Sequence, residues 1–143
     1  MNDAPALIVA ANAGFLENAA AVLLSPALDI ADVDSGQLSF AAVEISDGSF
    51  AGDGDALTVG GATSGSVNGI TFSWFPALHS LVFNGGSSVA NYQALLRTVV
   101  FQSTSDNPTD FGASPQRTLT WAVSDGTSVT TTTTTLDLSL IHI

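Results

Sequence analysis

Short segments with apolar residues at alternate positions make up most of the chain. They lie at residues 5–10, 28–32, 37–46, 52–61, 67–75, 79–86, 99–103, 117–126 and 128–143. Clusters of Gly, Asn, Asp and Ser separate them at intervals of about 8–12 residues, which is a spacing typical of a β-sandwich. The pattern therefore predicts an all-β fold, a Greek-key β-sandwich of about seven or more strands.

One of these strands changes its apolar phase partway along. Leu38, Phe40 and Ala42 alternate with polar or small residues, and the apolar positions then move to Val43 and Ile45. Because successive side chains of a strand point to opposite faces, a change of phase indicates one extra residue. We expect a β-bulge in this strand.

One segment departs from the alternating pattern and indicates a helix. Ser87 and Ser88 are suitable N-cap residues, and Arg97 lies near the expected C-terminal end. The residues that recur at helical spacing are Val89, Tyr92, Leu95, Leu96 and Val99. We expect a short helix at about 88–96 that crosses between strands.

Two features near the C-terminus bear on burial and exposure. Trp121 alternates with Leu119 and Val123, which predicts a side chain buried in the core between two sheets. The threonine run at 130–135 favours an exposed strand, since Thr is β-branched, and a glycosylated linker is the alternative.

Charge limits the classes of partner. The 143 residues fit one domain at 1–143 and include 13 acidic residues, Arg97 and Arg117, no lysine and no cysteine, for a net charge of −11. This balance argues against binding nucleic acid or an anionic membrane surface. Bound cations would relieve the self-repulsion of such a chain, and the alternative is that the charge only keeps the protein in solution.

The two ends of the sequence suggest a module taken from a longer protein. Met1 is followed by a short polar stretch with no signal-peptide pattern, and the last residues still have the pattern of a strand. The sequence contains no apolar run of about 18 residues, the length of a transmembrane helix. We expect one domain excised from a multi-repeat protein.

Catalytic motifs are poorly represented. His79 lies in an apolar strand context and His142 near the end of the chain, and no G-x-S-x-G motif is present. With two histidines and no cysteine, a zinc site is not expected either. Residues 32–43 fail the EF-hand pattern and residues 51–61 fail the nonapeptide calcium repeat. We expect that the chain is not an enzyme.

The remaining set of chemically suited residues offers only oxygen ligands. It consists of Asn2, Asp3, Glu17, Asp32, Asp34 and Asp125. Calcium prefers six to eight hard oxygen ligands, and several loops at one end of a sandwich can supply them. Asp32 and Asp34 are two residues apart and so point the same way in an extended chain, where a bound cation would offset their repulsion. The alternative is that these aspartates only cap turns.

The order of these motifs resembles a cadherin-like repeat of the dystroglycan type, found in tandem in bacterial surface and RTX-type adhesins. The segments that carry the resemblance are "NDAP", "LEN", "DVD", "NYQALLRTVVFQSTSDNP" and "RTLTWAVSDG". The resemblance covers nearly the whole chain, but the D-R-E motif of that family is missing. It implies a cadherin/Ig-like sandwich with Ca²⁺ bound by Asn2, Asp3, Asp32, Asp34 and Asp125 at one end, and with Glu17 at the opposite end.

The same resemblance implies a function. The expected role is an extracellular calcium-binding spacer or adhesion module of a bacterial surface or secreted protein. Its partners would be neighbouring repeats of the same chain, with matrix polysaccharide or another cell surface as further candidates. A carbohydrate-binding, lectin-like domain is the alternative, and exposed Trp74, Trp121 or Tyr92 would favour it.

Overall fold

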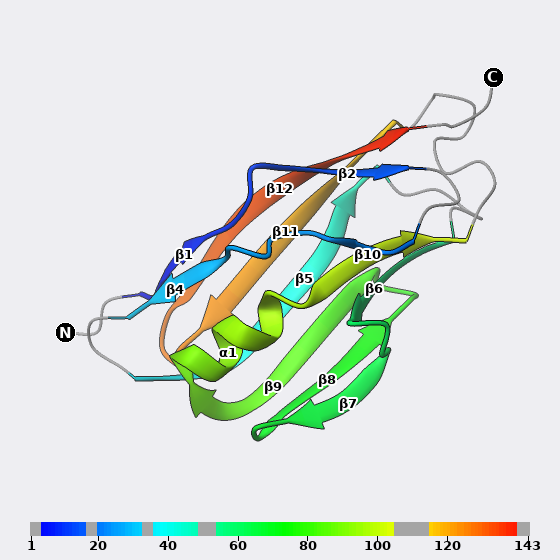
Figure 1. Cartoon of the computed structure of the whole chain (residues 1–143). Coiled ribbons are helices and arrows are strands. Elements are labelled where there is room, and N and C mark those ends of the chain that lie inside the picture. Colours follow the sequence, from blue (N-terminus) through cyan, green and yellow to red (C-terminus); the bar gives the residue numbers. More distant parts are fainter. Residues whose placement is uncertain (1–3, 17–19, 33–35, 49–53, 105–114, 140–143) are drawn as a thin grey trace.

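Seven strands form the larger of two layers (Figure 1). The computed structural model describes residues 4–16, 20–32, 36–48, 54–104 and 115–139. In spatial order the strands are β2 (Asn12–Leu16), β12 (Val129–Ser139), β11 (Gln116–Ser124), β5 (Gln37–Asp47), β9 (Ser80–Ser88), β8 (Ile70–Phe75) and β7 (Ser64–Val67). All neighbours are antiparallel except β2, which pairs parallel to β12.

The second layer is made of shorter elements. It contains β1 (Ala6–Ile8) paired with β4 (Asp29–Ala31), the sheet of β3 (Val22–Leu23), β10 (Val99–Ser103) and β6 (Asp55–Val59), and helix α1 (Val89–Leu96). Figure 1 shows all of them against the same face of the seven-stranded sheet. That face is therefore covered, and we call the opposite face of the sheet the outer face.

The N-terminal segment passes from one layer to the other. It pairs with β4 as β1 and then with β12 as β2. At the crossing, the backbone N–H of Ala10 donates to the hydroxyl of Ser25 at 2.9 Å, and the hydroxyl of Thr134 donates to the carbonyl oxygen of Ala10 at 2.7 Å. These bonds satisfy the backbone N–H and carbonyl groups of Ala10, at the point where the chain has left one sheet and has not yet joined the other.

Alternation along the central strands places the core between the layers. Leu119, Trp121 and Val123 of β11 are all buried, which confirms the prediction for Trp121. The indole N–H of Trp121 donates to the hydroxyl of Thr134 at 2.9 Å. The threonine run at 130–135 forms part of strand β12, as expected, but Thr134 belongs to the core and not to an exposed face.

Helix α1 agrees with its sequence signals. The hydroxyl of Ser88 accepts a hydrogen bond from the backbone N–H of Asn91 at 3.0 Å, the expected N-cap interaction. Tyr92 is buried, and its hydroxyl donates to the carbonyl oxygen of Gly85. At the other end, Nε of Arg97 donates to the carbonyl oxygen of Leu28 at 2.7 Å and so ties the helix to the segment before β4.

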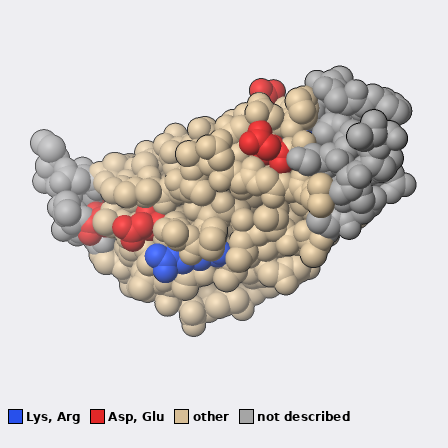
Figure 2. Space-filling view, turned by 45° about the horizontal axis from the view of Figure 1, so that its top comes forward, with Lys and Arg blue, Asp and Glu red and all other residues tan. Residues whose placement is uncertain are grey.

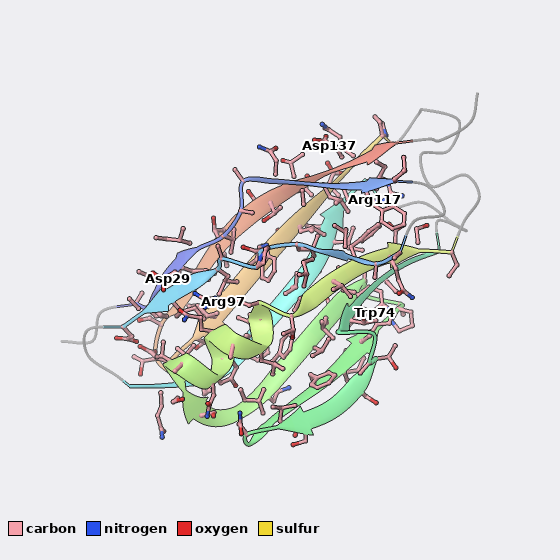
Figure 3. The ribbon with its side chains drawn as sticks, in the orientation of Figure 1. Asp29, Trp74, Arg97, Arg117 and Asp137 are labelled. Carbon is pink, nitrogen blue, oxygen red and sulfur yellow. The ribbon has the colours of Figure 1, made fainter. Side chains whose placement is uncertain are left out.

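A buried ion pair joins the two layers. Nε of Arg117, on β11, lies 2.5 Å from Oδ2 of Asp55, on β6, and both side chains are fully inaccessible to solvent. A second contact joins Nη2 of Arg117 to Oδ1 of Asp55 at 3.4 Å. One of the two arginines of the chain is thus used inside the protein (Figure 3).

The all-β sandwich with one short helix is confirmed, but several details differ. The apolar phase of β5 changes at Ser39, between Leu38 and Ala41, which is earlier than the sequence suggested. The strand expected at 67–75 begins only at Ile70, as β8. It follows a tight turn in which Asn68 and Gly69 adopt positive φ angles of 52° and 83°, and this turn joins it to the separate strand β7. The short strands β2, β3 and β7 were not predicted. That the chain is one domain excised from a longer protein stays a prediction.

Candidate functional site

The structure describes two of the six expected calcium ligands. Asn2, Asp3, Glu17 and Asp34 lie outside the described residues. Asp32 follows the end of β4, and Asp125 lies in the turn between β11 and β12. Figure 1 shows both elements ending on the side of the molecule where β1 begins, so these two aspartates lie towards the same end.

Asp125 has a local role in its turn. Its Oδ1 accepts hydrogen bonds from the backbone N–H groups of Thr127 and Ser128, both at 2.9 Å. This is the turn-capping role that the sequence left open as an alternative. Within the described part of the chain, no group of three acidic or histidine residues is arranged to hold a metal ion. Calcium binding therefore stays a prediction.

The aromatic residues on which a carbohydrate-binding site would depend are turned inward. Trp121 and Tyr92 are buried, and Trp74 is partly buried and packs against the core. His79 adopts a positive φ of 52° in the turn between β8 and β9, where its carbonyl oxygen accepts a hydrogen bond from the N–H of Ile45 at 2.9 Å. In the described structure, the three aromatic residues pack in or against the core, and His79 has a place in the β8–β9 turn.

The outer face of the large sheet is the surface that remains to be explained. Its residues follow from the strand register, because partners across a pair of strands point to the same side. Residues that form one row across the strands are Thr131, Ala122, Ala42, Val82, Ser73 and Ser64, and a second row is Thr133, Thr120, Glu44, Ser80 and Phe75. Nearly all of these side chains are short. No described helix or strand covers them (Figure 1).

An apolar strip runs through the centre of the outer face. Ala122, Ala42 and Val82 are neighbours on β11, β5 and β9, and each is half-buried. Phe40 lies beside them on β5, and Phe75 lies at the end of β8 with 44% of its surface exposed. The sequence failed to show this strip, because Phe40 and Ala42 face outward only as a result of the earlier phase change in β5.

The outer face carries negative charge and no positive charge among the described residues. Its acids are Glu44, Asp47 and Asp137, all exposed. Arg117 is buried, and Arg97 lies at the end of α1 in the other layer, near Asp29 (Figure 3). Figure 2, which is seen from the side of the second layer and not from the outer face, shows one small basic patch and acidic patches towards both ends of the molecule.

Comparisons with known proteins bear on the fold. No protein-family model matches the chain, and no curated protein matches it. Among solved structures, the chain is similar to a cohesin domain in a type I cohesin–dockerin complex from Clostridium thermocellum, with a TM-score of 0.54 and 10% sequence identity. The similarity covers 99% of this chain and 97% of that one. It shows a cohesin-like β-sandwich.

This finding corrects the assignment made from the motifs. The fold is cohesin-like, so the resemblance to a cadherin-like repeat is wrong, and so is the function derived from it as a calcium-binding spacer or adhesion repeat. The physical reason is that short Asp-rich motifs specify turns that many sandwiches share, as the two bonds accepted by Asp125 show. The lectin-like alternative fails with it.

Two other expectations agree with the structure. The structure that the chain resembles is a complex of two binding modules, and this agrees with the prediction that the chain is not an enzyme. Among the described helices, none has the length and apolar character needed to cross a membrane.

Proposed function

We propose that the chain is a cohesin-like docking module that binds a protein partner of the dockerin type through the outer face of its large sheet. The full-length similarity to a cohesin domain from a cohesin–dockerin complex is the observation that carries this proposal. The partner is a protein and not a polysaccharide, and the setting is an extracellular, cell-surface assembly of the kind that cohesins organise.

The size of the outer face supports the proposal. Strands about 4.8 Å apart and residues about 3.3 Å apart make a seven-stranded sheet with an 11-residue central strand roughly 30 Å wide and about 35 Å long. A specific protein–protein interface needs about 800 Å² from each partner. The outer face therefore offers enough area for one such interface without a contribution from other elements.

The composition of the outer face supports it as well. The cores of protein interfaces are depleted of charged residues, and side chains with many rotamers lose entropy when they are immobilised. Apart from Phe75 and Glu44, the two central rows contain only Ala, Val, Ser and Thr, and Glu44 is their one charged side chain. Binding on this surface would order few side chains, because most of them have little freedom to lose.

Calorimetric titration with a panel of dockerin modules tests the proposal. Ala42→Arg and Ala122→Arg each place a long charged side chain in the central apolar strip, and Ala94→Arg places the same side chain on the exposed surface of α1 as a matched control. We expect at least one dockerin to bind the unmodified chain. The two outer-face variants should lower its affinity at least about tenfold, and the helix variant should not.

Melting temperatures of the three variants establish that each one is folded. The proposal is wrong if no dockerin binds, or if the outer-face variants bind as tightly as the Ala94→Arg control. Equal loss of affinity in all three variants would also contradict it, because the effect would then come from added charge and not from position.

A further inference from the structure

The outermost strand of the large sheet has one side without a neighbouring strand. β7 (Ser64–Val67) pairs with β8, and no described strand lies beyond it (Figure 1). The N–H of Trp74 donates to the carbonyl oxygen of Thr63 at 2.8 Å, and hydrogen bonds between antiparallel strands fall on alternate residues. Bonding to β8 therefore falls on the odd-numbered residues of β7. The backbone N–H and carbonyl groups of Ser64 and Ser66 point away from β8, where another strand can bond to them.

The side chains of β7 do not obstruct such pairing. Natural sheet edges are usually protected by a lysine, a proline, a bulge or a covering element. β7 contains only Ser, Gly and Val, all four residues are exposed, and its register with β8 is regular. Phe72 of β8 fills the space beside Gly65, because a Cβ on Gly65 would lie 2.9 Å from the ring of Phe72. The edge is therefore uncharged, has short side chains and is open to a further strand.

The strands around β7 are also free of acidic residues. All 13 acids of the chain lie in residues 1–55 and 106–143, and residues 56–105 have none. Within the large sheet, the strand nearest to β7 that carries an acid is β5, with Glu44 and Asp47. β7, β8 and β9 thus form a neutral margin of a strongly acidic chain.

Two copies that met at β7 would keep their acids far apart. Three interstrand steps separate β5 from β7 in each copy, and one further step would join the two β7 strands. At about 4.8 Å for each step, the acids of the two β5 strands would be at least roughly 34 Å apart. The Debye length is about 8 Å at physiological salt, so their repulsion would be largely screened. For a chain with a net charge of −11, this edge is the part of the sheet where a second copy meets the least repulsion.

The sequence of the edge suits pairing with itself. The central residues Ser64, Gly65 and Ser66 read the same in both directions, and Thr63 and Val67 on either side are both β-branched. A two-fold axis through Gly65 would place Ser64 of each copy opposite Ser66 of the other. Each such pair exchanges two hydrogen bonds, so the outward backbone groups of both serines would be bonded.

We propose that two copies of this chain associate by antiparallel pairing of their β7 strands, which joins the two large sheets into one continuous sheet. This self-association uses an edge of the sheet and not its outer face, so it does not depend on the proposed docking function. The paired segment is only about 13 Å long and buries much less than the roughly 800 Å² per partner of a stable interface. The dimer is therefore weak, with a dissociation constant on the order of 10⁻⁴ M.

Sedimentation velocity at chain concentrations from about 0.01 to 1 mM measures the association. We expect mostly monomer at the lowest concentration and mostly dimer at the highest. Over the same range, hydrogen exchange followed by NMR should slow at the amides of Ser64 and Ser66 more than at any other described residue. Added salt should strengthen the dimer, because it screens the repulsion between two chains that each carry a net charge of −11.

Paired charge variants test the register. Ser64→Asp with Ser66→Asp in one chain would place carboxylates directly opposite each other and should weaken the dimer at least about tenfold. Ser64→Asp with Ser66→Lys would place opposite charges across the two-fold axis, so this variant should dimerise at least as tightly as the parent. The control is Thr131→Asp with Thr133→Asp, on exposed positions of β12, which adds the same net charge as the first variant and should change the dimer less than about twofold.

A backbone variant tests the hydrogen bonds themselves. Ser66→Pro removes an outward N–H but no bond to β8, and it should weaken the dimer at least about fivefold. Ser66→Thr keeps the N–H and should leave the dissociation constant within about twofold of the parent. Melting temperatures measured at low concentration, where the chain is mostly monomeric, establish that every variant is folded.

Three results would overturn the inference. The first is a chain that stays monomeric at about 1 mM. The second is a dimer that tolerates both Ser66→Pro and the Ser64→Asp, Ser66→Asp variant, because its contact would lie elsewhere. The third is loss of the dimer in Ala42→Arg, which would place the contact on the outer face. Dockerin binding is measured separately with the monomer, so a failure of the docking function and a failure of this inference are distinguishable.

Discussion

The buried ion pair between Arg117 and Asp55 offers a direct test of what holds the two layers together. Asp55→Asn removes one charge and leaves the guanidinium of Arg117 in a site with no solvent access. Removing one partner of a buried pair costs about 3–5 kcal/mol, because the other charge stays desolvated. The stability of a domain is about 5–15 kcal/mol, so this single change should remove a large part of it.

Urea denaturation and thermal melting measure the effect. For a chain of this size a loss of about 3–5 kcal/mol corresponds to a fall in melting temperature of roughly 10 °C or more. Asp137→Asn is the control, since Asp137 is exposed and accepts a bond from Gln116 at the surface, and it should stay within about 0.5 kcal/mol of the parent. The double variant Asp55→Leu, Arg117→Met should lose less stability than Asp55→Asn alone, because both desolvated charges are gone.

The reasoning would be refuted by an Asp55→Asn variant as stable as the control. It would also be refuted if the double variant lost as much stability as the sum of the losses measured for Asp55→Leu and Arg117→Met separately. In that case the two side chains would contribute independently, and the energy would not lie in their pairing.

Four further predictions concern other parts of the fold. Burial raises the pKa of Tyr92 to about 12. The stability that comes from keeping its phenol neutral is therefore fully present below about pH 10 and is lost as the pH rises through about 12. Tyr92 is the sole tyrosine, so its tyrosinate absorbance should appear near pH 12 in the folded chain and near pH 10 in urea. Thr134→Val should cost about 1–3 kcal/mol in urea denaturation, because it leaves the indole N–H of Trp121 without its acceptor. Gly85→Ala should destabilise the fold strongly on thermal melting, since its Cβ would lie 2.1 Å from a backbone oxygen at a φ of +126°. If calcium binds as the sequence predicts, the melting temperature should be higher in about 5–10 mM CaCl₂ than in EDTA. Asp125→Asn should reduce this rise but leave the melting temperature in EDTA unchanged, because an amide oxygen can still cap the turn.

The parts of the fold that local patterns specify were predictable. Helix α1 follows from a cap at Ser88 and apolar residues one turn apart, since both signals lie within a few residues of each other. The central strand β11 follows from strict alternation around Trp121. In each case the residues that decide the structure are neighbours in the sequence, so no knowledge of distant contacts was needed.

The parts that depend on distant partners were not predictable. The pairing of Arg117 with Asp55 joins residues 62 positions apart and has no local signal. The phase of β5 was ambiguous, because Phe40, Ala42, Val43 and Ile45 are all apolar and only the packing of the second layer decides which of them face inward. The apolar strip of the outer face depends on that decision, and so the candidate site could not be read from the sequence.

The use of the two arginines connects the electrostatics of the fold with the proposed docking function. With Arg117 inside the core and Arg97 bonded to the backbone near β4, the outer face has acids but neither lysine nor arginine among the described residues. A partner with basic side chains would be attracted to it over distances up to a Debye length, about 8 Å at physiological salt. Because such steering is screened by salt, the association rate of a true partner should fall as ionic strength rises, while its dissociation rate, set by contacts at the apolar strip, should change little.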